Sequence, residues 1–120
     1  MSALAWIEEE SHGDVPIARV HGEVDASNAK DIGGRLRAML SNRSETMVVD
    51  LSPTTYIDSA GLNTLFALAE EMRSRQQRLV LVIAEDSPIA RMVTLTGLDQ
   101  VAASYRALDD ALADGREDVA

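Results

Sequence analysis

The residues best suited to chemistry lie in the segment Ile57-Asp58-Ser59-Ala60-Gly61, where a predicted strand is followed by a predicted helix. A serine at the start of a helix lies beside unpaired backbone N–H groups and the positive end of the helix dipole. A phosphate attached to such a serine would be stabilised, as at other anion-binding helix N-termini. Ala60 and Gly61 are small, so a partner could approach the hydroxyl. The simpler alternative is that Ser59 only caps the helix, and the local pattern favours it because serine is a preferred cap residue.

Two acidic residues are expected near this serine. Asp58 precedes it, and Asp25 ends an earlier predicted strand. In a parallel arrangement both strand ends lie at the same edge of the sheet, where ligand sites of open α/β sheets form. A carboxylate there could help to deliver the serine hydroxyl to a kinase, or could bind a cation. The alternative is that both aspartates are ordinary cap and turn residues.

The sequence lacks the patterns of common enzyme sites. A nucleophile elbow requires glycine two residues before the serine, and Ile57 stands there. The only imidazoles, His12 and His21, lie near the N-terminus in no recognisable triad order. Neither a G-x-G-x-x-G nor a P-loop pattern is present, and histidine and acidic residues show no metal-ligand spacing. Lys30 is the only lysine, so the lysine of an aspartate-phosphorylated receiver domain is absent. We therefore expect no catalysis, no cofactor and no metal.

Charge and composition limit the partners. The 120 residues include 11 Lys and Arg against 20 Asp and Glu, a formal net charge of −9. This charge argues against binding nucleic acid or an anionic membrane, both of which require a positive surface. A basic surface on another protein fits better. With 46% hydrophobic residues, no cysteine and no apolar run near 18 residues, we expect a soluble, cytoplasmic protein with a core.

Hydrophobic periodicity predicts the elements that position these residues. Apolar stretches of strand composition fall at 4–7, 15–20, 47–51 and 79–84, with a weak strand near Val101. Helical spacing occurs over about 27–40 and 59–75, then from Ser87-Pro88 to a stop at Gly97, and finally around Leu108 to Leu112.

The resulting order, β-β-α-β-α-β-α-β-α, predicts an α/β fold with a mixed β-sheet and helices packed on it. The whole chain, residues 1–120, is expected to form one domain. The charged tail, 114–120, is expected to fray.

Three segments together resemble the STAS domain family, and in particular its bacterial anti-sigma factor antagonists. They are Gly22-Glu23-Val24-Asp25, the stretch from Asp50-Leu51-Ser52 through Tyr56 to Leu62, and Leu95-Thr96-Gly97-Leu98-Asp99. Their order and spacing match, and the likeness extends from about Val15 to Leu112.

The resemblance implies a phosphorylation switch. It implies that the unphosphorylated chain binds an anti-sigma factor, itself a serine kinase, and so frees a sigma factor. Phosphorylation at Ser59 would end this binding, and a serine phosphatase would reset it. The resemblance also places Asp25, Asp58, Ala60 and Gly61 at the surface that meets the kinase. A phosphate adds about −1.5 to −2 charges, which should leave the fold intact at a helix start. The alternative is a STAS scaffold or subunit of a larger signalling or transport assembly without a sigma factor.

Overall fold

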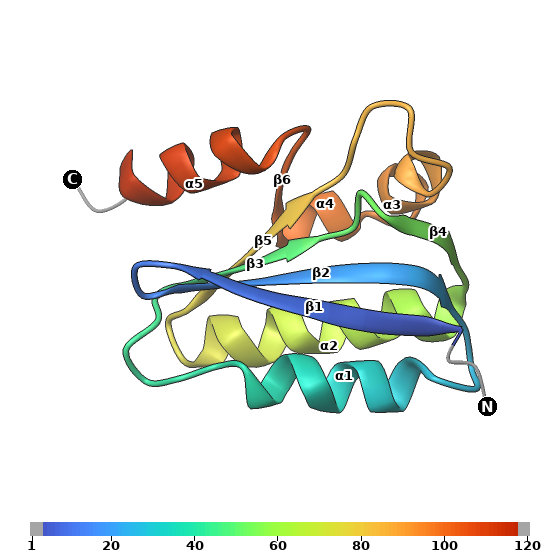
Figure 1. The fold of residues 1–120 in the computed structure, drawn as a ribbon, viewed down its shortest axis with the longest axis horizontal. Coiled ribbons are helices and arrows are strands. Elements are labelled where there is room, and N and C mark those ends of the chain that lie inside the picture. Colours follow the sequence, from blue (N-terminus) through green and yellow to red (C-terminus); the bar gives the residue numbers. More distant parts are fainter. Residues whose placement is uncertain (1–3, 118–120) are drawn as a thin grey trace.

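The computed structural model describes residues 4–117 and shows a six-stranded mixed sheet with helices on both faces (Figure 1). Its elements are, in chain order, β1 (Ala5–His12), β2 (Val15–Val24), α1 (Ala29–Ala38), β3 (Thr46–Asp50), β4 (Thr54–Ile57), α2 (Ser59–Ser74), β5 (Arg78–Val82), α3 (Ala90–Thr96), α4 (Leu98–Val101), β6 (Ala103–Tyr105) and α5 (Leu108–Glu117). The predicted α/β fold with a mixed sheet is confirmed. Helix α5 includes part of the tail for which we expected fraying, and residues 118–120 lie outside the described residues.

The strand order is β1-β2-β3-β5-β6, and β4 pairs separately with β2. Strand β1 is antiparallel to β2, whereas the other pairs are parallel. Strand β3 pairs with β2 over 17–19, and β4 pairs with β2 over 22–24. Strands β3 and β4 therefore run one after the other along the same side of β2.

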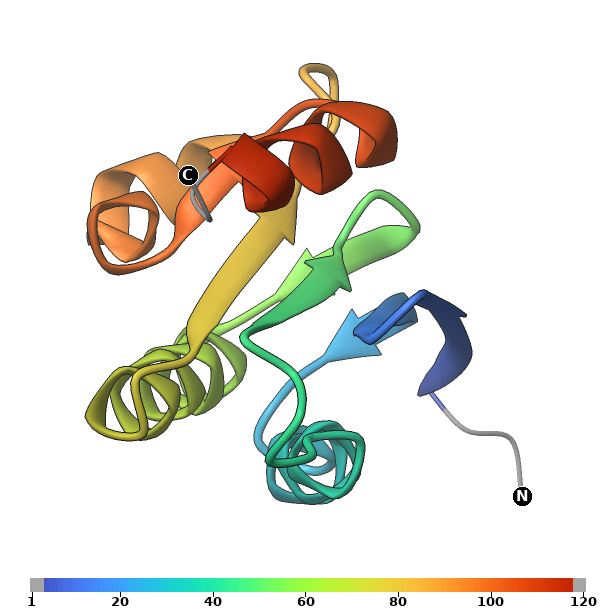
Figure 2. The ribbon, with the colours of Figure 1, turned by 90° about the vertical axis from the view of Figure 1, so that its left-hand side faces the viewer.

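Alternate residues of the central strands face two hydrophobic clusters, as the period of two in a strand requires. On β3, Met47 and Val49 join the larger cluster with α1 and α2, while Val48 joins the smaller cluster with α5. Strand β5 alternates in the same way. Figure 2 shows α1 and α2 below the sheet and α5 above it. Strand β5 is therefore covered on both faces.

Strand β1 extends to His12 and β2 to Val24, beyond the predicted 4–7 and 15–20. Three further details differ from the predicted elements. Strand β4 was not predicted. It has only four residues, two of its side chains are exposed, and it follows a proline. The helix expected from Ser87 begins at Ala90, although Gly97 ends it in the left-handed conformation as predicted. The weak strand expected near Val101 lies at Ala103–Tyr105, because Leu98–Val101 forms the short helix α4.

Gly22 is required where β1, β2 and β4 meet. Its φ is 89°, a conformation that side chains disfavour, and a Cβ there would lie 2.0 Å from the carbonyl oxygen of Leu4. That oxygen accepts a hydrogen bond of 2.9 Å from the N–H of Glu23. A side chain at Gly22 would therefore displace the strand pairing that leads to Asp25.

We predict that Gly22→Ala lowers the free energy of unfolding by at least about 2 kcal/mol, since it adds strain at positive φ to a backbone clash. Gly34→Ala is the matched control: Gly34 lies exposed inside α1, and a Cβ there meets nothing within 4 Å. Removing this helix glycine should stabilise the protein by about 0.5–1 kcal/mol. Urea unfolding of both variants tests the contrast, and a Gly22→Ala variant as stable as the parent would contradict it.

Candidate functional site

The candidate site lies at the carboxyl ends of β2 and β4. Val24 and Ile57 are paired in register at the ends of these parallel strands. The N–H of Asp58 donates to the carbonyl oxygen of Val24 over 3.1 Å, so the residues that follow the two strands begin side by side. This confirms the expectation that Asp25 and Asp58 share one edge of the sheet.

Asp58, and not Ser59, caps helix α2. Its backbone is extended, with φ −104° and ψ −172°, and its Oδ1 accepts hydrogen bonds from the N–H groups of Ala60 at 2.9 Å and Gly61 at 3.1 Å. The alternative reading of Asp58 as a cap residue is therefore correct, and that of Ser59 as the cap is wrong. An aspartate is among the best capping residues because its carboxylate accepts from the free N–H groups of the first turn.

Ser59 is left free by this arrangement. It is the first residue of α2, its side chain is exposed, and its hydroxyl makes no hydrogen bond within the described residues. The hydroxyl can therefore be reached from solvent and can enter another protein's active site without breaking a contact in this one.

The same cap changes the electrostatics expected at Ser59. The N–H groups of Ala60 and Gly61 already donate to the Asp58 carboxylate. The N–H of Leu62 donates to the Asp58 carbonyl oxygen. A phosphate on Ser59 would share the helix terminus with a carboxylate. The favourable interaction with the dipole, about 0.3–1 kcal/mol for an anion, would be opposed by repulsion from Asp58.

Asp25 organises the turn between β2 and α1. Its Oδ1 accepts a hydrogen bond from the Ser27 hydroxyl and another, of 2.9 Å, from the Ser27 N–H. These two hydrogen bonds, the hydroxyl one foremost, hold the pKa of the Asp25 carboxyl below its usual value. Asn28 completes the turn, accepting from the Asp25 N–H at 3.0 Å and donating to the Glu23 carbonyl oxygen at 2.9 Å. Asp25 thus presents a fixed negative charge at the edge that also carries Ser59.

Ala60 and Gly61 lie differently from the expected open partner surface. Ala60 is half-buried, and Gly61 is buried. A Cβ on Gly61 would lie 2.6 Å from Ile57 Cγ1 and 2.9 Å from Val24 Cγ1. The absence of a side chain at Gly61 therefore lets the start of α2 pack directly on the strand ends, which fixes the position of Ser59.

Sequence reasoning missed a hollow beside the site. A cavity of about 380 Å³ lies between α1 and α2, lined mainly by small residues that include Ala29, Gly33 and Ala60, with Lys30 among the lining residues. At Gly33 a Cβ would lie 2.7 Å from Thr64 Cγ2, so this glycine lets the two helices approach. The signal in the sequence was Gly33-Gly34 inside a helical pattern.

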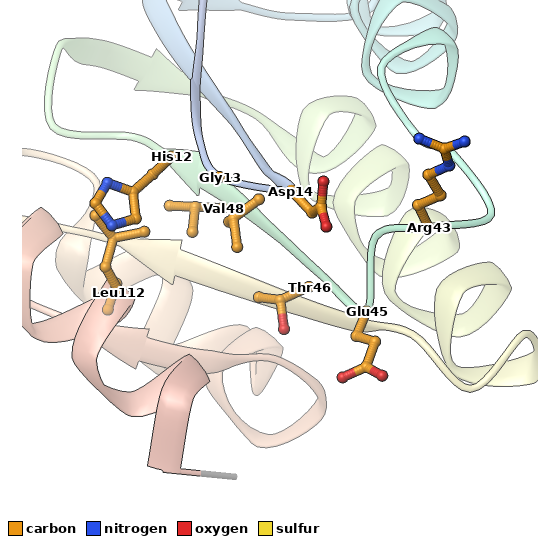
Figure 3. Close-up of a pocket in the computed structure, with 10 residues that line it drawn as sticks. His12, Gly13, Asp14, Arg43, Glu45, Thr46, Val48 and Leu112 are labelled. Carbon is orange, nitrogen blue, oxygen red and sulfur yellow. The ribbon is translucent and has the colours of Figure 1, made fainter. Parts of the chain in front are cut away.

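A larger cavity, of about 460 Å³, lies at the opposite end of the sheet (Figure 3). His12, Asp14, Arg43 and Glu45 are exposed around it, and Val48 is among its buried lining residues. It is built on the starts of β2 and β3, so it is separate from the Ser59 edge. The charges around it have both signs and do not select one kind of ligand.

Residues 4–117 contain no group of three or more His, Cys, Asp or Glu side chains that could hold a metal ion. None of the helices described there is long and apolar enough to span a membrane. His21 lies on β2, stacked on Trp6, and takes no part in the Ser59 edge.

Comparison with known proteins gives consistent matches. The family model described as Mlab, STAS domain matches residues 7–116. The chain is similar to the anti-sigma-F factor antagonist RsfB of Mycobacterium tuberculosis, with 29% identity over 101 residues covering 84% of this chain and 81% of the relative. It is 30% identical over 90 residues to the anti-sigma-B factor antagonist of Listeria monocytogenes, covering 75% of each chain.

The fold agrees with these matches. The crystal structure of an anti-sigma factor antagonist from Mycobacterium paratuberculosis superposes with a TM-score of 0.82 at 29% identity, covering 93% of this chain and 94% of that one. Family model, relatives and fold all span most of the chain, and the residues matched by the family model include Asp25, Asp58 and Ser59. The chain therefore belongs to the STAS domain family, among its anti-sigma factor antagonists.

Proposed function

We propose that this protein is an anti-sigma factor antagonist controlled by phosphorylation of Ser59. In its unphosphorylated form it binds an anti-sigma factor that is also a serine kinase, and the sigma factor is released. The kinase transfers the terminal phosphoryl group of ATP to the Ser59 hydroxyl, which ends the binding, and a serine phosphatase restores the free hydroxyl. The observation that carries the proposal is the exposed, unpaired hydroxyl of Ser59 at the start of a helix that Asp58 caps.

The switch works through the local cost of burying charge. A phosphoserine carries about −1.5 to −2 charges at neutral pH. Here the phosphate would lie beside the Asp58 carboxylate and near that of Asp25. An interface that closed over these charges without paired cations would lose several kcal/mol. A change at one side chain therefore controls binding while the sheet and helices keep their arrangement.

The protein's own part is to be a binding partner and a substrate, without catalysis or cofactor. We propose that it acts in the cytoplasm, as one domain spanning residues 1–120, where sigma factors and their regulators meet. Asp25 and Asp58 belong to the surface that the kinase contacts. Asp58 also fixes the start of α2, whereas Asp25 lies on a turn whose local hydrogen bonds an asparagine can partly keep.

We predict that Ser59 is the residue phosphorylated. Incubation with ATP and the cognate kinase should raise the intact mass by one phosphate, and Ser59→Ala should abolish the gain because it removes the exposed hydroxyl at the start of α2. Ser52→Ala is the control, since Ser52 is also exposed and follows β3 at the same end of the sheet. Phosphate mapped to Ser52, Ser87 or a threonine would contradict the assignment.

We predict that Asp25→Asn slows phosphorylation at least tenfold and changes the free energy of unfolding by less than about 1–2 kcal/mol, the range for one cap. The substitution keeps an oxygen that can accept from Ser27 but removes the negative charge. Initial phosphorylation rates and urea unfolding should be measured on the same preparations. A variant that is destabilised, yet phosphorylated at the normal rate per folded molecule, would show that Asp25 serves the fold alone.

We predict that phosphorylation leaves the fold intact and weakens kinase binding by at least a factor of 30. The melting temperature should change by no more than about 4 °C, since the dipole and the Asp58 carboxylate act in opposite directions and 1 kcal/mol corresponds to roughly this shift. Ser59→Asp adds only one charge and should weaken binding less. Thermal unfolding and titration calorimetry test both parts. Melting of the domain on phosphorylation, or tighter binding, would refute the mechanism.

A further inference from the structure

One face of the sheet is only partly covered by α5. This helix packs on β3, β5 and β6, and the hydrophobic cluster beneath it takes Val15 and Ile17 from the start of β2. Beyond these two residues, the same face of β1, β2 and β4 carries exposed side chains.

Strand pairing arranges these side chains in rows. Trp6 is paired with His21, and Glu23 with Tyr56. Leu4 lies beside Glu23, whose N–H donates to the Leu4 carbonyl oxygen. We call Leu4, Trp6, His21 and Tyr56 together the aromatic face, and Glu23 lies at its border. Their side chains share one side of the sheet because their neighbours Ala5, Val24 and Ile57 belong to the core on the other side.

The aromatic face is apolar and pre-ordered. Leu4, Trp6 and Tyr56 are 48%, 53% and 49% exposed, and they are three of the five large hydrophobic side chains found exposed in the described residues. The Trp6 and His21 rings stack with centroids 4.8 Å apart and planes 4° from parallel, and His21 Nε2 lies 2.9 Å from Glu8 Oε1. Tryptophan and tyrosine dominate the energetically important positions of protein interfaces, and rigid rings lose little freedom on binding.

Carboxylates border the aromatic face. Glu8 and Glu10 follow Trp6 on the same side of β1. Glu8 is paired with Arg19 of β2, and Glu10 with Ile17. Arg19 is paired in turn with Asp50 of β3. Arg19 is the one guanidinium of this group, and it contacts Glu8, Glu10 and Asp50. With Glu23, three exposed carboxylates and the buried Asp50 accompany one guanidinium, so the border carries an excess of negative charge.

The charge selects the occupant. A second copy of this chain would bring two proteins of net charge −9, and two acidic borders, against each other. A complementary surface has apolar side chains at its centre and Lys or Arg around them. The aromatic face also continues to the candidate site, since Tyr56 lies two residues before Asp58 on the strand that ends there.

We infer that the aromatic face is a second part of the surface bound by the anti-sigma factor kinase, which meets it with an apolar patch bordered by basic side chains. The inference rests on the proposed function and extends it. The partner contacts two neighbouring regions, the Ser59 edge, which phosphorylation changes, and the aromatic face, which it does not. The second region supplies affinity and fixes the orientation in which Ser59 is presented to the kinase.

The sole tryptophan of the chain gives a direct test. This 120-residue chain, labelled with 5-fluorotryptophan, has a single ¹⁹F resonance, from Trp6, even when the partner contains tryptophan. Titration with the kinase that phosphorylates Ser59 should shift or broaden this resonance in step with binding measured by calorimetry. Trp6→Ala should weaken binding at least tenfold, with an unfolding midpoint measured alongside to confirm that the variant is folded.

Two glutamates provide a matched pair for the charge. Glu23 and Glu9 are both exposed strand residues. Glu9, however, is paired with Ala18, whose side chain belongs to the larger hydrophobic cluster, so Glu9 lies on the side of the sheet away from the aromatic face. Glu23→Lys should weaken kinase binding at least fivefold more than Glu9→Lys, although both change the net charge equally.

The outcomes separate this inference from the proposed function. Suppose that the kinase binds and that Ser59 phosphorylation releases it, while the ¹⁹F resonance is unmoved and Trp6→Ala binds within twofold of the parent. The inference is then wrong and the proposed function stands. Equal effects of Glu23→Lys and Glu9→Lys would likewise overturn the charged border. If the unphosphorylated protein binds no kinase at all, the proposed function itself fails.

Discussion

The pairing of β4 with the end of β2 is the constraint on which the site depends. It aligns Val24 with Ile57 and joins Asp58 to Val24 through a backbone hydrogen bond, so that two segments distant in sequence leave the sheet together. Gly22 makes the approach of Leu4 possible on one side of β2, and the buried hydroxyl of Thr54 donates to the Val20 carbonyl oxygen over 2.6 Å on the other. Gly61 then allows α2 to start directly on the paired strand ends.

Adjacent residues divide two tasks at the start of α2. A helix needs an acceptor for its first N–H groups, and a substrate serine needs a free hydroxyl. If Ser59 were the cap, its oxygen would be engaged in the turn, and phosphorylation would remove a contact that holds the helix. Asp58 supplies the acceptor instead. Ser59 is thus held in place by its backbone, while its side chain makes no hydrogen bond within the described residues.

Much of this could be predicted from the sequence, for physical reasons. The apolar runs and helical periods predict β2, β3, β5, α1 and α2. A parallel arrangement of the strands that end before Asp25 and Asp58 predicts that both residues lie at one edge of the sheet. Strand β4 could not be predicted because its four residues have no clear strand pattern of their own, and pairing with β2 stabilises it. The capping of α2 could not be decided, since Asp58 and Ser59 are both good caps and only backbone geometry distinguishes them. Gly61 was assigned to an open surface because the local sequence does not show that Val24 packs against it.

Strand β4 has a further consequence for the energetics of the native state. Within the described residues it is paired on one side only, with β2, and it is one of the shortest strands. Short elements with a single neighbour open at a lower free energy than a central strand such as β5, without unfolding of the whole domain. Amide hydrogen exchange in β4 would therefore report a local opening, which would detach the start of α2 from the sheet. The free energy of that opening sets the fraction of time for which Ser59 is held in its native position.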